Sequence, residues 1–429
     1  MIKITENRSY KYLIYSNIYL VEGVASFLIF SILPIYLKNY RGLSDLAIAI
    51  LAGVSLIPIV LKPIVAVISD KYSIAILGGR RKPYMIIGFI LNGFTLSFIG
   101  IIDPMDFIYL FTLFWLLQSL GISLMDVAID ALVTESFPQT NEKVNANIAF
   151  YISNISSLFL LIPITYLMEE NSIHIGAYLA PQFQFDLFLG GNFDLGFLLA
   201  GIICFSLIIS TLFLKEDENI QTRPKFSRKA LKEFLKSKYV PTLLFMFFLL
   251  EIDNGLAEFT LEPFFRISGL TASSQLLYYL PTMIFVILGS ISSKWFVKKG
   301  IIRSITFFAL IYAGHYAILC FLTLFSPSTT PLYYYIAAII VGLVANAAFI
   351  LYMTLAMNSA DKEIAATTFI LFITMINLGR VFGIIIAGII PFTGNLKMFI
   401  IFFISAITMI IRIPVFLKLK ELDHGKNPL

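Results

Sequence analysis

The segment VSLIPIVLKPIVAVISDKYSIAILGGRRKPYMIIGFILNGFTLSFIG, residues 54–100, places two long apolar runs on either side of a short basic loop. A helix that crosses the roughly 30 Å hydrocarbon core of a bilayer needs about 20 apolar residues. Because lipid offers no partner for unpaired backbone groups, each run is predicted to be a transmembrane helix. Residues 54–100 therefore indicate two membrane crossings joined by a polar turn.

The composition extends this pattern to the whole chain of 429 residues. Hydrophobic residues make up 59% and charged residues 13%, whereas soluble domains contain about 25% charged residues. This composition excludes a water-soluble globular fold. We predict an all-α membrane protein with twelve transmembrane helices, near residues 11–38, 43–69, 84–103, 107–136, 142–168, 192–214, 239–265, 272–293, 303–325, 332–358, 363–392 and 396–417.

The distribution of Lys and Arg predicts the orientation of these helices. If the N-terminus lies inside, inner segments contain 24 of the 31 Lys and Arg residues and outer loops contain four. Both termini are therefore predicted to be cytoplasmic, in the cell membrane or alternatively an organellar one. The basic inner segment 215–238 separates six spans from six, so the predicted domains are 1–214 and 239–429. We interpret 215–238 as a solvated linker at the anionic leaflet, with a regulatory site as the alternative.

The two halves of the chain show an internal repeat. Residues 121–142 match residues 342–363 at a constant offset of 221, and the same offset aligns Gly79 and Lys82 with Gly300 and Arg303. Matches in the same order on equivalent spans indicate two pseudo-symmetric, parallel six-helix bundles. This arrangement is used by major facilitator transporters, whose substrate site lies between the halves near the midplane.

Several motifs resemble one branch of that superfamily, the folate-biopterin transporters. They are YLVEG (19–23), YLKNYRGLS (36–44), PIVLKP (58–63), ISDKY (68–72), GGRRKPY (78–84) and DVAIDALVTE (126–135). AATTFILFITMINLGR (365–380) is also similar to muropeptide permeases and acetyl-coenzyme A transporters. The resemblance implies the major facilitator fold and transport of a folate- or pterin-like solute or another organic anion.

Ionisable residues inside the predicted spans are candidates for the transport site, because such residues usually face a bundle interior or cavity. Asp126 and Asp130 lie four residues apart and share one helix face. We expect Lys62, on a neighbouring span, to form an ion pair with one or both. A purely structural pair and a mechanistic pair both remain open.

Glu22 and two acids in the second half are candidate proton carriers. Glu22 lies near the bilayer midplane, where folate carriers of the family have Gln; it either changes protonation or stays neutral and acts as Gln would. Glu251 and Asp253 lie on the seventh span at angles that prevent both from facing Arg380. Asp126 and Asp130 complete the predicted proton-coupling set.

Arg380, near mid-depth of the eleventh span, is predicted to face the substrate, because Arg suits bidentate contact with a carboxylate or phosphate. A buried structural pair is the alternative. We expect Arg412, near an inner helix end, to extend its charge to the membrane surface. Lys62 and further residues at cavity-prone positions complete the predicted substrate site: Tyr19, Asn147, Tyr151, Asn254, Tyr278, Asn346 and Asn377.

Asp70, Arg80, Arg81 and Lys82 flank the inner loop of the opening segment. They resemble the loop signature of the superfamily, in which an Asp at a helix end and loop Arg residues latch neighbouring helices. The alternative is a purely orienting role for the basic residues. In the second copy the Asp position is Ser293, so we expect a weaker latch there.

Other classes of protein lack support in the sequence. It contains no GxxxxGK[ST] phosphate loop, no GxSxG elbow and no Cys or His spacing for metal, so we expect neither an enzyme, a cofactor, a metal site nor nucleic-acid binding. The predicted function is secondary active transport by alternating access with proton coupling, in a monomer whose partners are a small-molecule substrate, protons and lipid. The alternative is a non-transporting relative that acts as an assembly factor or membrane scaffold.

Overall fold

The computed structural model describes most of the chain. The described residues are 2–3, 8–39, 41–72, 74, 79–137, 139–169, 193–216, 226–258, 272–325, 336–337, 339–361, 363–390 and 394–420. The outer stretch 170–191, the linker residues 217–225 and the end of the seventh predicted span, 259–265, lie outside this description.

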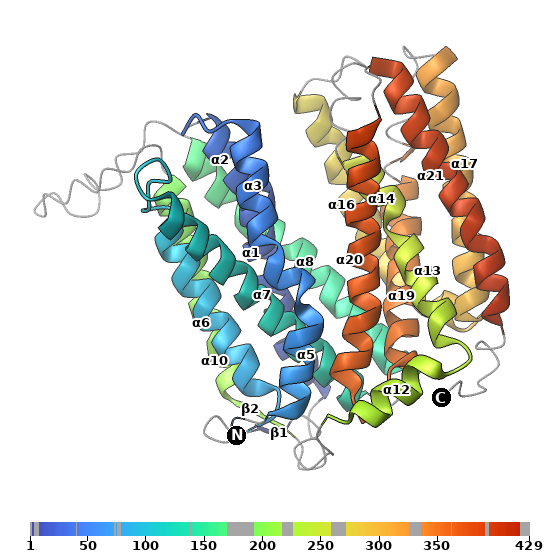
Figure 1. Ribbon diagram of the computed structural model, residues 1–429, viewed down its shortest axis with the longest axis horizontal. Helices are drawn as coiled ribbons and strands as arrows, with labels where there is room; N and C mark the ends of the chain where they lie inside the picture. The colour runs from blue at the N-terminus through green and yellow to red at the C-terminus, as the bar shows by residue number, and fades with distance from the viewer. Residues whose placement is uncertain are drawn as a thin grey trace, which may run out of the picture. The chain divides into compact units, whose positions relative to one another are not determined.

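Contacts divide the chain into two units, drawn in Figure 1 as groups of long helices. Unit 1 comprises Met1–Ser136 and Ala149–Lys225, and unit 2 comprises Phe137–Ile148 and Phe226–Leu429. Helix α8, Thr140–Glu169, therefore contributes its first residues to unit 2 and the remainder to unit 1.

Unit 1 consists of helices and one short parallel strand pair, in which Ile2 pairs with Leu214 and Lys3 with Lys215. Besides part of α8, its elements are β1 (Ile2–Lys3), α1 (Arg8–Phe27), the π-helical turn η1 (Leu28–Ile32), α2 (Leu33–Asn39), α3 (Asp45–Ser55), α4 (Ile57–Val60), α5 (Lys62–Lys71), α6 (Lys82–Ile99), α7 (Ile108–Ser136), α10 (Phe193–Leu212) and β2 (Leu214–Lys215).

Unit 2 is helical throughout its described part. Its elements are α12 (Arg228–Lys236), α13 (Val240–Leu250), α14 (Ile252–Glu258), α16 (Ala272–Val297), α17 (Ile301–Phe325), the π-helical turn η4 (Ile340–Ala345), α19 (Asn346–Ser359), α20 (Ala365–Ile389) and α21 (Gly394–Lys418).

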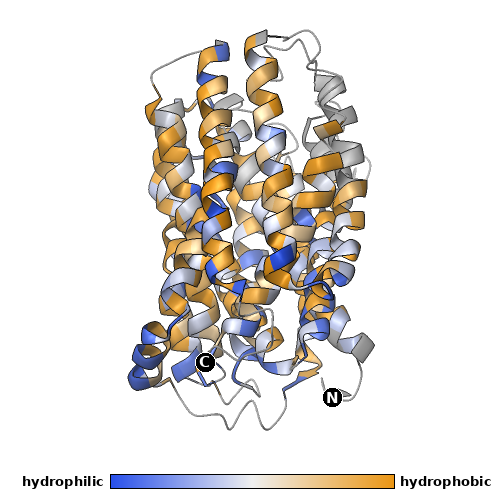
Figure 2. Ribbon diagram, turned by 90° about the vertical axis from the view of Figure 1, so that its right-hand side faces the viewer, coloured by the Kyte–Doolittle hydropathy of each residue, from blue (hydrophilic) through white to orange (hydrophobic). Residues whose placement is uncertain are grey.

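Among the described residues, eight helical stretches are long and apolar enough to cross a membrane, and a bent ninth begins at α12. Figure 2 shows hydrophobic residues along the length of the helices and hydrophilic residues gathered at one end. The predicted helical membrane class is confirmed at this level.

The second predicted span is broken into three helices, α3, α4 and α5, that still form one apolar stretch, Ile50–Lys71. Pro58 and Pro63 occupy the first turns of α4 and α5, where a missing N–H is tolerated. Because proline has no N–H to donate, each one interrupts the hydrogen bonding along the span. The second interruption places Lys62 at the start of α5.

Glycines allow helices of unit 2 to approach one another closely. An ideal Cβ at Gly379 of α20 would lie 1.9 Å from the carbonyl oxygen of Phe248 in α13, and one at Gly383 would lie 2.2 Å from that of Ile252 in α14. Small residues at such contacts let membrane helices pack backbone to backbone. Gly388, further along α20, has no neighbour within 4 Å of an added Cβ.

This difference yields a stability prediction within one helix. Gly379→Ala is expected to destabilise the protein by about 1–3 kcal/mol, because the backbone of Phe248 must move away. Gly388→Ala is the control and is expected to leave stability unchanged. The measurement is the temperature at which half of the detergent-purified protein aggregates, and equal values for both variants would contradict the close packing.

Candidate functional site

Lys62 at the start of α5 and Asp126 in α7 form a buried ion pair in unit 1. The Lys62 ammonium donates to Oδ2 of Asp126, and only 8% and 10% of the two side chains is exposed. The ion pair expected from sequence spacing is therefore present in the structure.

Two further carboxyls adjoin this pair. Asp130, one turn along α7, accepts a hydrogen bond of 2.6 Å from the Tyr19 hydroxyl of α1. Glu22, also on α1, interacts electrostatically with Lys62 and Asp126, and its Oε2 is buried without a hydrogen-bond partner among the described residues. We call Lys62, Asp126, Asp130, Tyr19 and Glu22 the Lys62 cluster. It contains three carboxyls and one ammonium.

Unit 2 contains a second buried charge pair, between Asp253 of α14 and Arg412 of α21. Only 2% and 3% of the Arg412 and Asp253 side chains is exposed, and the Tyr316 hydroxyl of α17 donates to the second Asp253 oxygen at 3.1 Å. The prediction that Arg412 extends to the membrane surface is wrong, because its guanidinium points inward to a carboxylate that lies 159 residues away in sequence. We call Asp253, Arg412 and Tyr316 the Arg412 cluster.

Glu251, Asn254 and Arg380 form further polar contacts near this buried pair. The amide of Asn254 donates to Glu251 at 3.0 Å, and Arg380 acts electrostatically on Glu251. Arg380 itself is exposed on α20. Asp253 thus forms an ion pair with Arg412, whereas Glu251 interacts electrostatically with both Arg380 and Arg412.

The remaining predicted cavity residues differ in their surroundings. Asn147, in the part of α8 that belongs to unit 2, is buried and donates to the Thr354 hydroxyl at 3.1 Å. Asn346 donates to the Gly342 carbonyl of its own helical segment at 3.1 Å. Tyr151 and Asn377 are partly buried, and the side chain of Tyr278 lies outside the described residues.

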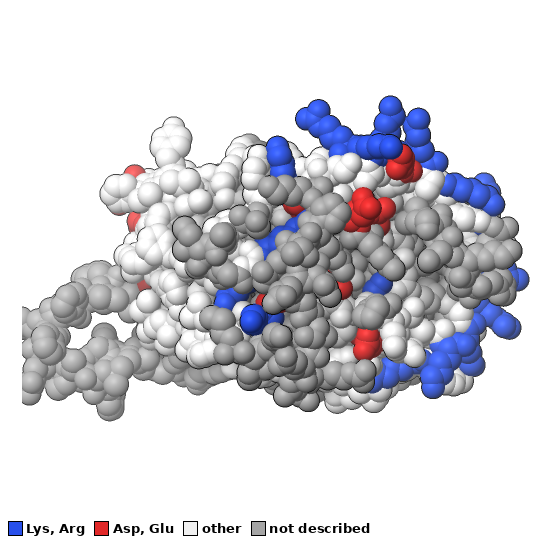
Figure 3. All heavy atoms as spheres, turned by 90° about the horizontal axis from the view of Figure 1, so that it is seen from below, with Lys and Arg blue, Asp and Glu red and all other residues white. Residues whose placement is uncertain are grey.

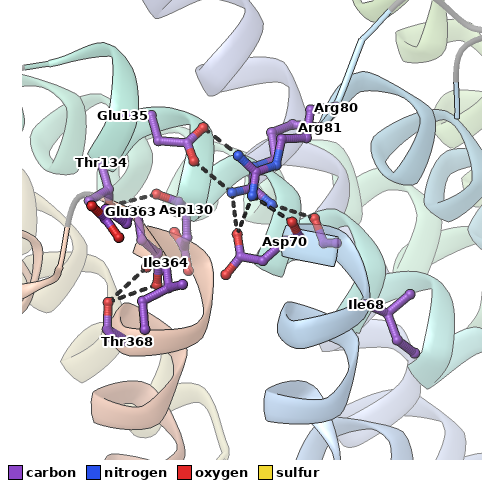
Figure 4. Close-up of polar contacts among 12 residues, drawn as sticks. Ile68, Asp70, Arg80, Arg81, Asp130, Thr134, Glu135, Glu363, Ile364 and Thr368 are labelled. Atoms are coloured by element: carbon purple, nitrogen blue, oxygen red, sulfur yellow. Dashed lines mark hydrogen bonds and ion pairs between the residues drawn. The ribbon is translucent and has the colours of Figure 1, made fainter. Parts of the chain in front are cut away.

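At one end of unit 1, Arg81 joins three helices through its guanidinium (Figure 4). It donates to Asp70 of α5 and to Glu135 of α7, both at 2.6 Å, and to the Ser69 hydroxyl at 2.7 Å. Arg80 donates to the Asp70 backbone carbonyl at 2.6 Å. Because none of the Arg81, Asp70 and Glu135 side chains is more than 1% exposed, this is a buried network rather than a row of solvated charges.

Lys82 and Ser293 are not part of such a network. The Lys82 ammonium donates to the Leu212 carbonyl at the end of α10, at 2.7 Å. Ser293 is buried and donates to the Ser290 carbonyl of its own helix at 2.6 Å.

Glu216 adds a second contact at the same loop of unit 1. Its carboxylate accepts hydrogen bonds from the backbone N–H groups of Arg80, Arg81 and Lys82, at 2.8, 2.7 and 2.5 Å, and Lys82 is the first residue of α6. A Cβ at Gly79 would lie 2.5 Å from this carboxylate, so the cradle requires glycine there. Burial raises the pKa of Glu216, while the three N–H groups favour the charged form.

Sequence reasoning did not identify Glu135, Glu216, Arg412 or Tyr316 as site residues. Glu135 is the last residue of the motif DVAIDALVTE, and a carboxylate at the end of a predicted span could have been recognised as a partner for the basic loop. Glu216 and Arg412 gave no such signal, because their partners lie 134 to 159 residues away in sequence.

The sequence was compared with protein families and with known proteins. The model of the Major Facilitator Superfamily matches residues 16–384. The chain is 23% identical over 320 residues to "Putative transporter AmpG 4" of Rickettsia felis, which covers 69% of this chain and 72% of that protein. It is 35% identical over 104 residues to "Probable folate-biopterin transporter 7" of Arabidopsis thaliana, which covers 24% and 23%.

Solved transporters share the fold at low sequence identity. A bacterial homologue of the iron transporter ferroportin, in an outward-facing state, superposes with a TM-score of 0.70 at 13% identity, covering 96% of this chain and 99% of that one. The human organic anion transporter MFSD10 gives 0.69 at 11% identity, covering 95% and 99%.

The family match, the transporters among the relatives and the apolar helices together define a multi-pass membrane transporter of small molecules, and not an enzyme. The chain belongs to the Major Facilitator Superfamily. The predicted resemblance to this superfamily, including its folate-biopterin transporter branch, is confirmed.

The Lys62–Asp126 pair yields a double-mutant prediction. Removing one partner of a buried pair costs roughly 3–5 kcal/mol, so Lys62→Ala is expected to lower detergent stability strongly. Asp126→Asn in the same background is expected to recover part of the loss, because it removes the unpaired charge. Strictly additive losses across the four proteins, measured as aggregation temperatures, would contradict direct contact.

Proposed function

We propose that this protein is a proton-coupled secondary transporter that moves an organic anion by alternating access. The excess of buried carboxyls in the Lys62 cluster is the observation that supports proton coupling. The family membership supports transport itself.

The charge balance of the Lys62 cluster favours proton binding. Lys62 neutralises Asp126, which leaves Glu22 and Asp130 without a cation of their own. An ionised carboxylate in a low-dielectric interior without a cation is costly, and the usual remedy is protonation. A rearrangement that moved Lys62 or admitted water to α1 would make release of that proton easier. We therefore assign the coupling proton to Glu22 or Asp130.

The second half is the less suitable place for the coupling proton. Asp253 is matched by one cation, Arg412, and accepts a hydrogen bond from Tyr316. Glu251 has Asn254 as a donor and Arg380 as a nearby cation. Glu251 and Asp253 thus remain the secondary candidates for coupling.

The proposed substrate is an anion that resembles folate or a pterin. Arg380 and the names of the similar proteins support this choice. Arg380 is exposed on α20, and a guanidinium suits bidentate contact with a carboxylate. The Arabidopsis relative is named for folate and biopterin, of which folate carries carboxylates. Lys62 and the predicted polar residues Tyr19, Asn147, Tyr151, Asn254, Tyr278, Asn346 and Asn377 complete the proposed substrate-binding set.

The proposal includes a finer architecture. We infer twelve spans in two six-helix bundles, residues 1–214 and 239–429, joined by the linker 215–238, with both termini cytoplasmic. The distribution of Lys and Arg and the internal repeat support this arrangement. We further infer a monomer in the cell membrane, and a latch function for Asp70, Arg80 and Arg81.

Substitution of Glu22 and Asp130, the two carboxyls of the Lys62 cluster that form no ion pair among the described residues, tests proton coupling. In reconstituted vesicles with an imposed pH gradient, screened with folate, pterins and other organic anions, the wild type is expected to accumulate substrate. Glu22→Gln and Asp130→Asn keep the side-chain shape but cannot release a proton. At least one of them is expected to abolish pH-driven accumulation while substrate exchange continues.

The matched control is Glu363→Gln, which neutralises an exposed carboxyl of unit 2. It is expected to accumulate substrate as the wild type does. If both cluster variants keep the wild-type dependence of accumulation on pH, the coupling site lies elsewhere, with Glu251 and Asp253 as the remaining candidates. Absence of flux for every anion tested would instead favour the scaffold alternative.

Cysteine labelling tests the orientation. Met105 is 66% exposed in the turn between α6 and α7, and Lys229 is exposed on α12. In a background without Cys204 and Cys320, Met105→Cys is expected to react with an impermeant maleimide in intact cells. Lys229→Cys is expected to react only after permeabilisation, and labelling of both from one side would contradict the proposed topology.

A further inference from the structure

Helix α12 lies across the direction of the span that follows it. Its first N–H groups are capped by Ser227, whose hydroxyl accepts from the Ala230 N–H at 3.3 Å. After Lys236 the chain turns by 80° into the apolar stretch Val240–Leu256 (Figure 1). Val240–Leu256 is the apolar part of this pair, so it is the part that enters the bilayer, and the 80° turn then orients the polar α12 close to the membrane plane.

The side of α12 that faces the protein is fixed by one aromatic residue. Phe234 is 2% exposed, and its ring lies edge-on to Phe372 of α20 with centroids 5.9 Å apart. This contact packs α12 against α20 and so determines which side of α12 is buried.

The opposite side of α12 is cationic. At 3.6 residues per turn, its four basic residues fall within an arc of about 100° that is centred opposite Phe234. All four are exposed, and the only acid on the helix, Glu233, lies 3.9 Å from one of them in a solvated pair. The four are Arg228, Lys229, Lys232 and Lys236.

An apolar edge adjoins these cations. Leu235 is 41% exposed and follows the cationic arc around the helix, with partly buried Leu231 beside it. An exposed leucine beside a row of cations is typical of helices that lie at a membrane surface, where apolar side chains enter the acyl boundary and cations meet the headgroups.

The same end of unit 2 carries further cations but few acids among its described residues. Figure 3 views this end of the molecule and shows Lys and Arg side chains projecting along its rim. These exposed residues lie at the ends of α16 and α21 and include Lys294, Lys298, Lys299, Lys418 and Lys420.

We propose that the exposed face of α12 is a binding site for the phosphate groups of anionic phospholipids. The charge complementarity of four cations, the exposed Leu235 and the in-plane orientation together point to this occupant. The proposal rests on the inner placement of this end of the protein, where the anionic leaflet lies. It makes α12 more than a solvated linker, since lipid bound there holds the start of unit 2 at the membrane surface.

The test uses the full-length protein in nanodiscs of neutral phosphatidylcholine with increasing phosphatidylglycerol. Retention of phosphatidylglycerol is measured by native mass spectrometry, and stability by aggregation temperature. The triple variant R228Q/K232Q/K236Q is expected to weaken retention by roughly a hundredfold, because each cation near an anionic surface contributes to binding. Wild-type retention is expected to fall with added salt.

The matched control K298Q/K418Q/K420Q removes three exposed cations from the same end of unit 2 but leaves α12 intact. It is expected to change retention only a few-fold, and the charge-conserving R228K/K232R/K236R variant is expected to bind as the wild type does. Equal losses in the triple variant and the control would overturn the proposal, because they indicate general attraction by inner cations. Equal stabilisation by inorganic phosphate would also overturn a lipid site.

The proposed transport function can fail separately. Substrate exchange in neutral vesicles does not depend on anionic lipid, so its absence in the wild type argues against transport and leaves the lipid result standing. Loss of lipid binding in R228Q/K232Q/K236Q with normal exchange supports the lipid site alone. Reaction of Lys229→Cys with an impermeant reagent in intact cells would place α12 on the outer side and overturn the proposal.

Discussion

A charge buried among membrane-spanning helices needs an opposite charge or a hydrogen-bond partner within the protein, because lipid supplies neither. In unit 1 this requirement joins Lys62 of α5 to Asp126 of α7, and in unit 2 it joins Arg412 of α21 to Asp253 of α14. Each pair fixes which faces of its helices turn inward. In unit 2, close glycine contacts between α20 and the α13–α14 pair add backbone-to-backbone packing to this ion pair.

The two units meet this requirement with different charge balances. The Arg412 cluster has one cation for one carboxylate, with Tyr316 as an additional donor. The Lys62 cluster has one cation for three carboxyls, with Tyr19 as the donor to Asp130. A balanced pair is stable in one protonation state, whereas an excess of acids leaves groups that can take up or release a proton. The proposed proton coupling depends on this asymmetry.

The internal repeat preserves helix order but not the chemistry at the helix ends. In unit 1, Arg81 connects Asp70 and Glu135, and Glu216 caps the start of α6. At the position equivalent to Asp70, Ser293 bonds within its own helix. Among the described residues, this loop network is therefore found in unit 1, whereas in unit 2 α12 packs on α20 through Phe234 and Phe372.

The sequence by itself determined the class of protein, because a helix in lipid needs a long apolar run and such runs are visible without a structure. It also determined the superfamily, through motifs such as GGRRKPY, and it predicted an ion pair of Lys62 with Asp126, Asp130 or both, of which the structure shows the pair with Asp126. Only the tertiary structure decided the partners of Arg412, Lys82 and Glu216. Those contacts join residues 130 or more positions apart, and they depend on how the helices pack, which hydrophobic periodicity does not specify.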